Sequence, residues 1–534
     1  MVASCAKTEE VAATAAETVT SVDIALTETI SDTGPPDAVS ALDPGVDTAP
    51  LPPPVFGPEA RGLVVARGAL HVHSVFSHDA CDGHVDEVSV DAACEAEFIA
   101  QICTSGLDFI FLTDHPSNMS KHPFPALLHH DEKRGDTLVK SAAGDPYANV
   151  VHCKDGDGGL AAHDVVITVG FEGTHTMPVR LGKHLDPPEL EKYALTDVND
   201  LEKQKSVGAA VHAVDGVWLN AHSEEDEISA ERLAALPLDG MELYNTHANF
   251  NVILKGGKLE KLFDLQAFLD GAPEPPAADL VLLSMLDVFP EPGIIKWYKV
   301  SAMRPITAVI GADVHQNVNL DGYCTPGGQY EALCDALAEQ YPALVAALKK
   351  GGPLKLTDQK RIDSYERIFR WFHNRVYVTE RSANAVADGI RKGRVMTVFT
   401  VFGEVANVDV HATEAGSIVE MGGQVSLAKS PKIVVRPPDP PVARPWSPFT
   451  ADEAKSAVVT AKLMLVDKDG KTEVSAEFEA KPDALLTFGP DRPGRYHVEV
   501  MITPKHLSRA LAGRKDLAEK SYRWLVTNPI YVAK

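Results

Sequence analysis

The sequence predicts a mixed α/β protein in which a parallel sheet or barrel is followed by a small antiparallel β-sandwich. Three observations lead to this prediction. The 534 residues are enough for two or three domains of ordinary size. From about residue 60, short apolar runs alternate with helical stretches, which is typical of a parallel α/β sheet. After about residue 404, turn residues alone separate the runs, as in antiparallel sandwiches.

The α/β region is expected over residues 59–403. Its apolar runs have strand length and lie at 69–72, 107–113, 165–171, 217–221, 240–244 and 306–311. Helical patterns between them cover 91–104 and 197–214. Two stretches, near 116–164 and 250–300, interrupt the alternation, and we interpret both as insertions over one face. The first is rich in His, Gly and Asp, and the second contains a helical piece over 259–269 and a Pro-rich turn.

The C-terminal region, residues 404–534, has a different pattern. Pro, Gly and Asp turns separate strand-like runs at 432–436, 461–466, 474–480, 485–488, 495–502 and 522–526. Short strands separated by such turns predict the β-sandwich.

The first 58 residues are expected to be an acidic, Pro-rich tether. They contain few large apolar residues, so they cannot bury enough surface to offset the entropy of ordering. Val2-Ala3-Ser4-Cys5 resembles a bacterial lipobox, although the basic start and apolar core of a signal peptide do not precede it. We therefore expect an exported lipoprotein, periplasmic or at the outer surface, whose membrane contact is a lipid on Cys5. The alternative is a cytoplasmic protein with an ordinary N-terminal tail.

Cysteine usage bears on the same question. Six cysteines besides Cys5 form an even set, which fits disulfides in an exported protein. Cys324 and Cys334 are the best candidates for a pair, because the chain between them is rich in turn residues. In a cytoplasmic protein the same six would be free thiols.

Composition limits the classes of function. The net charge is −25, which disfavours binding to nucleic acid phosphates through basic residues. No apolar run approaches the roughly 20 residues of a spanning helix. A small anionic substrate remains compatible with this charge, because bound metal ions can reverse the field locally.

Histidines and carboxylates recur where the predicted strands end. They are His71, His73, Asp79, Asp114, His115, Glu172, His222, Glu242, His247, Asp313 and His315. Residues two apart in a strand face the same side, so His71 and His73 can reach one ion. In a βα barrel the strand ends converge on one mouth, where active sites lie. Imidazole and carboxylate are ligands of zinc, iron and manganese, so the pattern predicts a metal site.

These motifs resemble those of the PHP superfamily, named for polymerase-associated and histidinol-phosphatase domains. The resemblance covers about residues 60–403 and rests on His71-Val72-His73-Ser74, Ser77-His78-Asp79-Ala80, the run from Gly106 to His115, Glu172, Asn220-Ala221-His222 and Gly311-Ala312-Asp313-Val314-His315. It implies a distorted seven-stranded βα barrel, two or three divalent metals and phosphoesterase activity. The run from Ser417 to Gly423 resembles the C-terminal module of exported members.

The resemblance also implies roles for single residues. His71, His73 and Asp313 would bind the first metal, Glu172 would bridge to a second metal on His222, and Asp79, His115 and His315 would hold a third. Asp82 competes with Asp79, which we favour. Glu242, Asn245 and His247 compete for a further position, and His247 is our choice.

Catalysis would need few further groups. His315 or His247 could protonate the leaving oxygen, since imidazole titrates near neutrality. Arg180 could contact a phosphate, and His175 or His184 could face the substrate. Packing, loop or surface roles are expected for His122, His129, His130, His152, His163, His212, Arg391, Lys392 and Arg394.

The predicted function is therefore metal-dependent hydrolysis of a small-molecule phosphate ester or a similar anionic substrate. Zinc is the favoured metal, with manganese or iron as alternatives. An amidohydrolase-like C–N hydrolase is a second interpretation, although no metal-bridging lysine is found at a strand end. A non-catalytic cell-surface binding protein is the third, and the intact ligand set argues against it.

Overall fold

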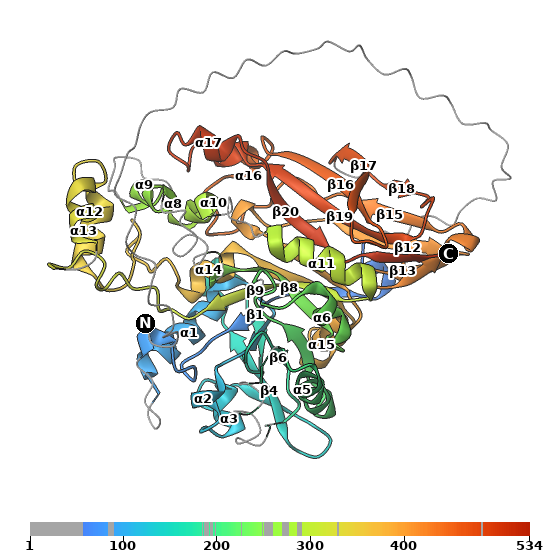
Figure 1. Cartoon of the computed structure of the whole chain (residues 1–534), viewed down its shortest axis with the longest axis horizontal. Helices are drawn as coiled ribbons and strands as arrows, with labels where there is room; N and C mark the ends of the chain where they lie inside the picture. Colours follow the sequence, from blue (N-terminus) through green and yellow to red (C-terminus); the bar gives the residue numbers. More distant parts are fainter. Residues whose placement is uncertain are drawn as a thin grey trace, which may run out of the picture. The chain divides into compact units, whose positions relative to one another are not determined.

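The computed structural model describes residues 57–83, 90–183, 185, 192, 196–197, 199–225, 227–247, 249, 260–269, 277–285, 291–327, 330–481 and 484–534. The predicted tether, with Cys5, lies outside these residues except for its last two positions. Val55–Lys534 form one compact unit. Its described part is a mixed α/β structure with a large sheet and a second, four-stranded antiparallel sheet (Figure 1), which confirms the predicted class.

Parallel strands form the centre of the large sheet. In spatial order they are β7 (Val217–Asn220), β8 (Gly240–Asn245), β9 (Thr307–Val314), β1 (Val64–Val72), β2 (Phe109–Leu112) and β5 (His163–Val169). These are the strands that the apolar runs predict. Most of their residues are buried, which explains why these strands read as largely apolar runs.

A short strand, β6 (Met177–Val179), touches both ends of this parallel row. It pairs antiparallel with β7. The backbone N–H of Leu181 donates to the carbonyl of Val169 at the end of β5, and that of Phe171 donates to Pro178. The strands at the two ends of the row are therefore linked through one hairpin.

Helices pack on the parallel strands, and their ends follow local capping chemistry. α1 (Ala92–Ser105) begins after Asp91, whose side chain accepts from two backbone N–H groups of the first turn. α5 (Leu201–Ala213) packs on β7 and begins after Asp200, which caps it in the same way. The predicted helix over 197–214 thus starts four residues later than expected. α11 (Glu291–Met303) contacts β8, and α15 (Ala383–Arg391) contacts β10 (His373–Val378).

The first predicted insertion contains strands that extend the large sheet. β3 (Thr137–Lys140) and β4 (Pro146–Cys153) form a hairpin, and β4 pairs antiparallel with β5. α2 (Pro116–Met119) and α3 (Phe124–Leu127) precede the hairpin. In the second insertion, the helix expected over 259–269 is instead two short helices, α8 (Glu260–Phe263) and α9 (Gln266–Leu269). The break between them falls at Asp264 and Leu265.

Shorter elements complete the N-terminal region. They are η1 (Glu59–Arg61), η2 (Cys81–Gly83), η3 (Asp157–Gly159), α6 (Ala230–Ala235), η4 (Ala278–Leu280), α10 (Val281–Met285), α12 (Glu331–Leu337), α13 (Pro342–Lys350), α14 (Tyr365–Trp371), β11 (Val395–Val398) and η6 (Thr400–Phe402). α1 packs against α14, and α6 packs against α11.

The strands of the C-terminal region are β12 (Asp409–Glu414), β13 (Ser417–Glu420), β14 (Gln424–Ser426), β15 (Lys432–Arg436), β16 (Val458–Val466), β17 (Thr472–Glu479), β18 (Leu486–Phe488), β19 (Gly494–Thr503), β20 (Tyr522–Thr527) and β21 (Ile530–Ala533), with η7 (Leu427–Lys429), α16 (Ala451–Ala454), η8 (Lys505–Leu507) and α17 (Lys515–Ala518) between them. Six of these strands, β15 to β20, occur where the sequence predicts strands, and β12, β13, β14 and β21 were not predicted. The smaller sheet has the order β13-β12-β15-β18.

The remaining C-terminal strands continue the large sheet. β17, β16, β19 and β20 pair in this order, and β20 pairs with β11 of the α/β region. α11 contacts β19 as well as β8 (Figure 1). Strands on both sides of residue 404 therefore share one hydrogen-bonded sheet. The predicted division into domains near that residue stays a prediction, as does the sandwich.

Three disulfides join the six described cysteines. Cys324 and Cys334, the predicted pair, are bonded, with Cα atoms 6.0 Å apart. The other bonds are Cys81–Cys94 and Cys103–Cys153, which tie the loop after β1 and the strand β4 to α1. Within the described residues, no helix combines the length and apolar character that crossing a membrane requires.

Candidate metal centre

The predicted ligands follow the carboxyl ends of the parallel strands and meet in one group. Every member has a nitrogen–oxygen distance of 3.6 Å or less to another member. This histidine–carboxylate cluster consists of His71, His73, Asp79, His115, Glu172, His222, His247, Asp313 and His315. Because carboxyl ends of parallel strands lie at the same edge, residues distant in the sequence come together there.

The backbone at several of these residues is unusual. His71, His222 and Asp313 have φ values of 59°, 51° and 47°, in the left-handed region that residues other than glycine rarely adopt. The pairing of β1 with β2 shifts register between Leu70 and Val72, so His71 lies at a bulge. The expectation of a regular strand at His71 is therefore wrong, although both imidazoles reach the cluster. Strained backbone of this kind is common at functional sites.

Glu172 lies at the centre of the first group of ligands. Its Oε2 atom is 3.1 Å from Nε2 of His73 and 3.3 Å from Nε2 of His71. Its Oε1 atom is 2.7 Å from Nε2 of His222. On the other side, Oδ1 of Asp313 is 3.4 Å from Nε2 of His71. Glu172 thus contacts different histidines with its two oxygens, as a bridging carboxylate would.

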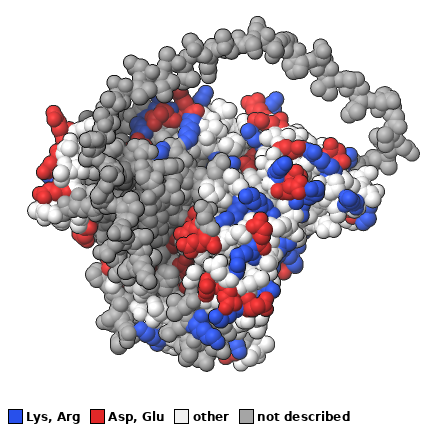
Figure 2. Space-filling model, in the orientation of Figure 1, with Lys and Arg blue, Asp and Glu red and all other residues white. Residues whose placement is uncertain are grey.

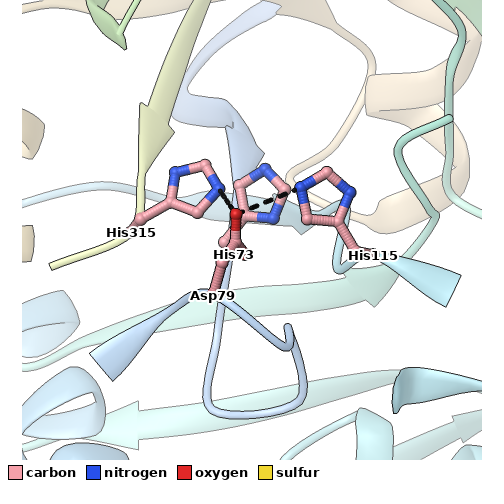
Figure 3. A group of neighbouring side chains, drawn as sticks. All are labelled: His73, Asp79, His115 and His315. Carbon is pink, nitrogen blue, oxygen red and sulfur yellow. Dashed lines mark ion pairs between the residues drawn. The ribbon is translucent and has the colours of Figure 1, made fainter. Parts of the chain in front are cut away.

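Asp79 organises a second group, drawn in Figure 3. Its Oδ2 atom lies between two imidazoles, 3.4 Å from Nε2 of His315 and 3.5 Å from Nε2 of His115. The ring of His73 stacks on that of His315, with centroids 3.7 Å apart. The Ser77 hydroxyl donates to Oδ1 of Asp79 and so orients the carboxylate. The ligand atoms of His73, Asp79, His115 and His315 lie within 4.8 Å of one another.

His247 lies on the more open side of the cluster. Its Nδ1 atom is 3.6 Å from Oδ2 of Asp313, and its side chain is 43% exposed. His315 is 6% exposed by the same measure. Together His247, Asp313 and His315 form a third group that could hold a metal ion. Burial lowers the pKa of His247, but the Asp313 carboxylate outweighs this effect and raises it above its usual value.

Unpartnered polar atoms show that the cluster fits divalent cations. Nε2 of His71, Nε2 of His73 and both carboxylate oxygens of Asp313 are buried and have no hydrogen-bond partner. Such atoms are costly to bury unless something else binds them. Tetrahedral ligands about 2.0–2.1 Å from zinc lie roughly 3.3 Å from one another. The four distances from His71 and His73 to Glu172 and Asp313, 3.1–3.6 Å, are close to that separation.

The electrostatics also match a ligand set. Burial lowers the pKa of His73 to about 3, and the neighbouring His315 imidazole adds to the effect. His73 is therefore neutral, as a metal-binding imidazole must be. Burial would raise the pKa values of Glu172 and Asp313, but the surrounding imidazoles, that of His71 first, together outweigh it and hold both well below their usual range. Both carboxyl groups are ionised.

The ring nitrogens that face away from the cluster are held by other groups. Nδ1 of His73 lies 3.1 Å from the Ser77 hydroxyl. Nδ1 of His71 lies 2.6 Å from Oε1 of Glu242. Each contact turns Nε2 toward the cluster, which is the usual arrangement behind metal-binding histidines. The sequence signal for Glu242 was a carboxylate inside an apolar strand, and its contact with His71 was missed.

The residues that the sequence offered as alternative ligands lie outside the cluster and have other partners. The Asp82 carboxylate binds the guanidinium of Arg361 and the amide of Asn319, at 2.7 and 2.8 Å. Glu242 and Asn245 lie behind His71, in contact with its Nδ1 atom.

Other residues predicted near the substrate contact other parts of the chain. The Arg180 guanidinium donates to the carbonyl and carboxylate of Asp215 and to Asn384, and it lies 4.8 Å from the Tyr147 ring centroid. Its contacts therefore do not support the predicted role at a phosphate. His175 pairs with Glu227 at 3.0 Å. His184 lies outside the described residues.

Histidines expected to have packing or loop roles have local partners. His129 pairs with Glu95, His152 with Asp164 and His212 with Asp239. His130 lies 3.3 Å from Asn149, and His163 contacts a backbone carbonyl. Arg391 binds the backbone before β7, and Lys392 pairs with Asp388.

Comparison with known proteins adds little. No protein-family model matches the sequence, and no curated protein matches it significantly. The chain is similar to a solved two-domain protein from Bacteroides vulgatus ATCC 8482, described as containing a predicted PHP-like metal-dependent phosphoesterase. The identity is 13% and the TM-score 0.28, over 85% of this chain and 95% of that one. Because this likeness is so distant, the chemistry of the site follows from its own geometry.

Proposed function

We propose that the protein is a metal-dependent phosphoesterase that uses two or three divalent ions, with zinc as the favoured metal. The observation that carries this proposal is the histidine–carboxylate cluster, with its buried nitrogen and oxygen atoms that lack partners. Divalent ions held there would lower the pKa of bound water and neutralise charge that develops on phosphoryl oxygens.

The charges of the cluster favour three ions. The cluster contains three carboxylates, Asp79, Glu172 and Asp313, and Glu242 and Glu224 lie against its histidines. In the described part of the chain the ion pairs of these five are to histidines alone. Two divalent ions carry less charge than five carboxylates, and a third would leave an excess of positive charge. An anionic phosphate ester needs that excess, because Arg180 is engaged by Asp215.

The residues of the chain would divide the work as follows. One ion would be held by His71, His73, Asp313 and Glu172. A second would be held by Glu172 and His222, and a third by Asp79, His115 and His315. His247 is the best-placed proton donor to a leaving oxygen, because its ring is partly exposed whereas His315 is buried. Nδ1 of His247 faces Oδ2 of Asp313 at 3.6 Å, so Nε2 is the ring nitrogen left for the substrate.

The distorted barrel that the sequence resemblance implies is part of the same proposal. We propose that the seven strands β7, β8, β9, β1, β2, β5 and β6 form the distorted barrel, because β6 bonds to both β5 and β7. A barrel would give the cluster the position that active sites occupy in such folds, at the carboxyl ends of the strands.

The substrate is proposed to be a small molecule. On the face shown in Figure 2, acidic and basic side chains are interspersed over the described residues. Together with the net charge of −25, this mixture disfavours a nucleic acid partner. Export is proposed as well, with a lipid on Cys5 as the membrane contact. The three disulfides support export, because such bonds persist in oxidising compartments.

The function is tested with an aryl phosphate and a set of natural phosphate esters. Hydrolysis should disappear with a chelator and return with Zn²⁺ or Mn²⁺. His73→Ala should abolish it. His152→Ala is the matched control, because His152 is an exposed histidine that pairs with Asp164 on the β4–β5 hairpin. Hydrolysis of amides in place of phosphates would overturn the phosphoesterase proposal in favour of a C–N hydrolase. Equal phosphatase activity in His73→Ala would assign the activity to another site.

A further inference from the structure

Glu242 is a buried carboxylate directly behind the cluster. Its exposed fraction is 0%, and it lies on β8 between strands that carry ligands. Oε1 is 2.6 Å from Nδ1 of His71. Oε2 accepts the backbone N–H of His222 at 2.8 Å and the side-chain amide of Asn245 at 3.2 Å. One carboxylate therefore contacts the side chain of one predicted ligand and the backbone of another.

These contacts determine which nitrogen of His71 carries a proton. A backbone N–H and an amide NH₂ can only donate, and an ionised carboxylate can only accept. Nδ1 of His71 is therefore the donor in its 2.6 Å contact with Glu242. The amide nitrogen of Asn245 also lies 3.3 Å from Nδ1, but it donates to Oε2 of Glu242. In the neutral ring Nε2 then keeps its lone pair. Nε2 is buried without a hydrogen-bond partner and lies 3.3 Å from Glu172 and 3.4 Å from Asp313.

A glycine makes room for this contact. Gly311 of β9 lies opposite Leu70 in β1 and Asn245 in β8. A Cβ atom at residue 311 would overlap Oε1 of Glu242 and would lie 3.3 Å from Cβ of His71. A side chain at Gly311 would therefore force Glu242 away from His71. The His71–Glu242 contact therefore depends on residues of three neighbouring strands, β1, β8 and β9.

We infer that Glu242 is a positioning residue for the metal centre, an inference that rests on the proposed function. Through Nδ1 it fixes the ring of His71 so that Nε2 faces the ion. Through the backbone of His222 it fixes the start of the loop that carries a second ligand. Glu242 thus acts from behind the ligands, although its position in the sequence had made it a candidate ligand itself. Carboxylates behind metal-binding histidines also strengthen the donor nitrogen, and their loss typically weakens metal binding about 10- to 100-fold.

The first test compares Glu242→Gln with Glu499→Gln. Glutamine has one oxygen and one NH₂ group, so it cannot accept from all three donors around residue 242, and at least one of these hydrogen bonds is lost. Glu499 is the matched control, because it is also buried in a strand and bonds to Tyr298, His497 and Arg523, away from the cluster. Zinc affinity is measured by competition with a chromophoric chelator, and the Co²⁺-loaded protein is examined by visible absorption.

Glu242→Gln should bind zinc about 10- to 100-fold more weakly and should change the Co²⁺ bands, whereas Glu499→Gln should do neither. Unchanged zinc affinity in folded Glu242→Gln would overturn the inference and leave the proposed function standing. Absence of zinc binding by the wild-type protein would overturn both.

A second test needs no substitution. In a crystal structure of the zinc-loaded wild-type protein, Nε2 of His71 should lie about 2.0–2.1 Å from an ion. Glu242 should remain on Nδ1. Zinc on Nδ1, or zinc bound directly by the Glu242 carboxylate, would overturn the inference even if the substituted protein fails to fold.

Discussion

Glu172 approaches His222 with one carboxylate oxygen, at 2.7 Å from Nε2, and turns the other oxygen toward His71, His73 and His115. One carboxylate thus connects ligands that come from three different parallel strands and the loops after them. The arrangement is that of a bridge between two ions, because each oxygen serves a separate set of imidazoles. In the proposed metal centre, the spacing of the ions would therefore depend on this side chain more than on any single histidine.

The bridge can be tested by Glu172→Gln. Glutamine keeps the size of the side chain but loses the negative charge and one acceptor oxygen, so two ions should lose a ligand at once. Metal content measured by mass spectrometry should fall by two equivalents per chain. Loss of one equivalent would show that Glu172 binds a single ion, and full retention would show that it is no ligand.

Asp79 and Asp82 are close in sequence but differ in their contacts. Asp79→Asn should lower metal content by about one equivalent and abolish hydrolysis, because Asp79 lies between His115 and His315. Asp82→Asn should leave metal content unchanged and lower the free energy of unfolding by about 1–3 kcal/mol, because it weakens the contact with Arg361. Metal analysis and urea unfolding of both variants check this pair. The reverse result would make Asp82 the ligand.

The disulfides should differ in their contribution to stability. Cys103–Cys153 closes a loop of 50 residues and Cys324–Cys334 one of 10 residues. From loop entropy, their removal should lower the free energy of unfolding by about 4 and about 3 kcal/mol, respectively. Cys324 and Cys334 also pack with Val345 in a small separate apolar cluster. Urea unfolding of the two double Cys→Ser variants gives the order, and a larger effect at Cys324–Cys334 would contradict it.

His506 should make stability depend on pH. It is buried in the C-terminal region, where burial lowers its pKa to about 4. The unfolded chain takes up this proton near pH 6.5, so unfolding becomes easier as pH falls from about 6.5 to about 4. Protonation of His506 in the unfolded chain should make the free energy of unfolding about 2 kcal/mol lower at pH 5 than at pH 7.5.

The measurement compares wild type with His506→Gln, whose amide can still donate to the Phe402 carbonyl that the His506 ring contacts. The difference in the free energy of unfolding between the two proteins should change by about 2 kcal/mol between pH 7.5 and 5.0, in favour of the variant. A difference that stays constant over this range would show that His506 does not titrate as its burial implies.

The sequence predicts the central strands well because they are buried on both faces. Runs such as 165–171 and 306–311 are apolar apart from one threonine each, and the structure has β5 and β9 there. β10 was missed because His373-Asn374-Arg375 places polar residues in a strand whose Asn374 bonds to the backbone of Ile310. β3 and β4 were missed because turn residues dominate the surrounding stretch, although the hairpin gains its stability by pairing with β5.

The ligand set is more predictable than its geometry. Histidines at strand ends identify the cluster members, since strand ends of parallel sheets converge. The bulge at His71 and the left-handed backbone of Asp313 could not be predicted, because both depend on packing against neighbouring strands. The contact of Glu242 with His71 joins residues far apart in sequence, and spacing along one chain cannot reveal it.

The most direct test of the metal centre is a count of metal ions in the purified wild-type protein that has never met a chelator. The cluster contains nine side chains, each close to at least one other, with buried atoms that lack partners, so the protein should contain two or three equivalents of divalent metal per chain. Elemental analysis by mass spectrometry, with protein concentration from amino-acid analysis, gives this number. Less than one equivalent, with none taken up from added Zn²⁺ or Mn²⁺, would contradict the account.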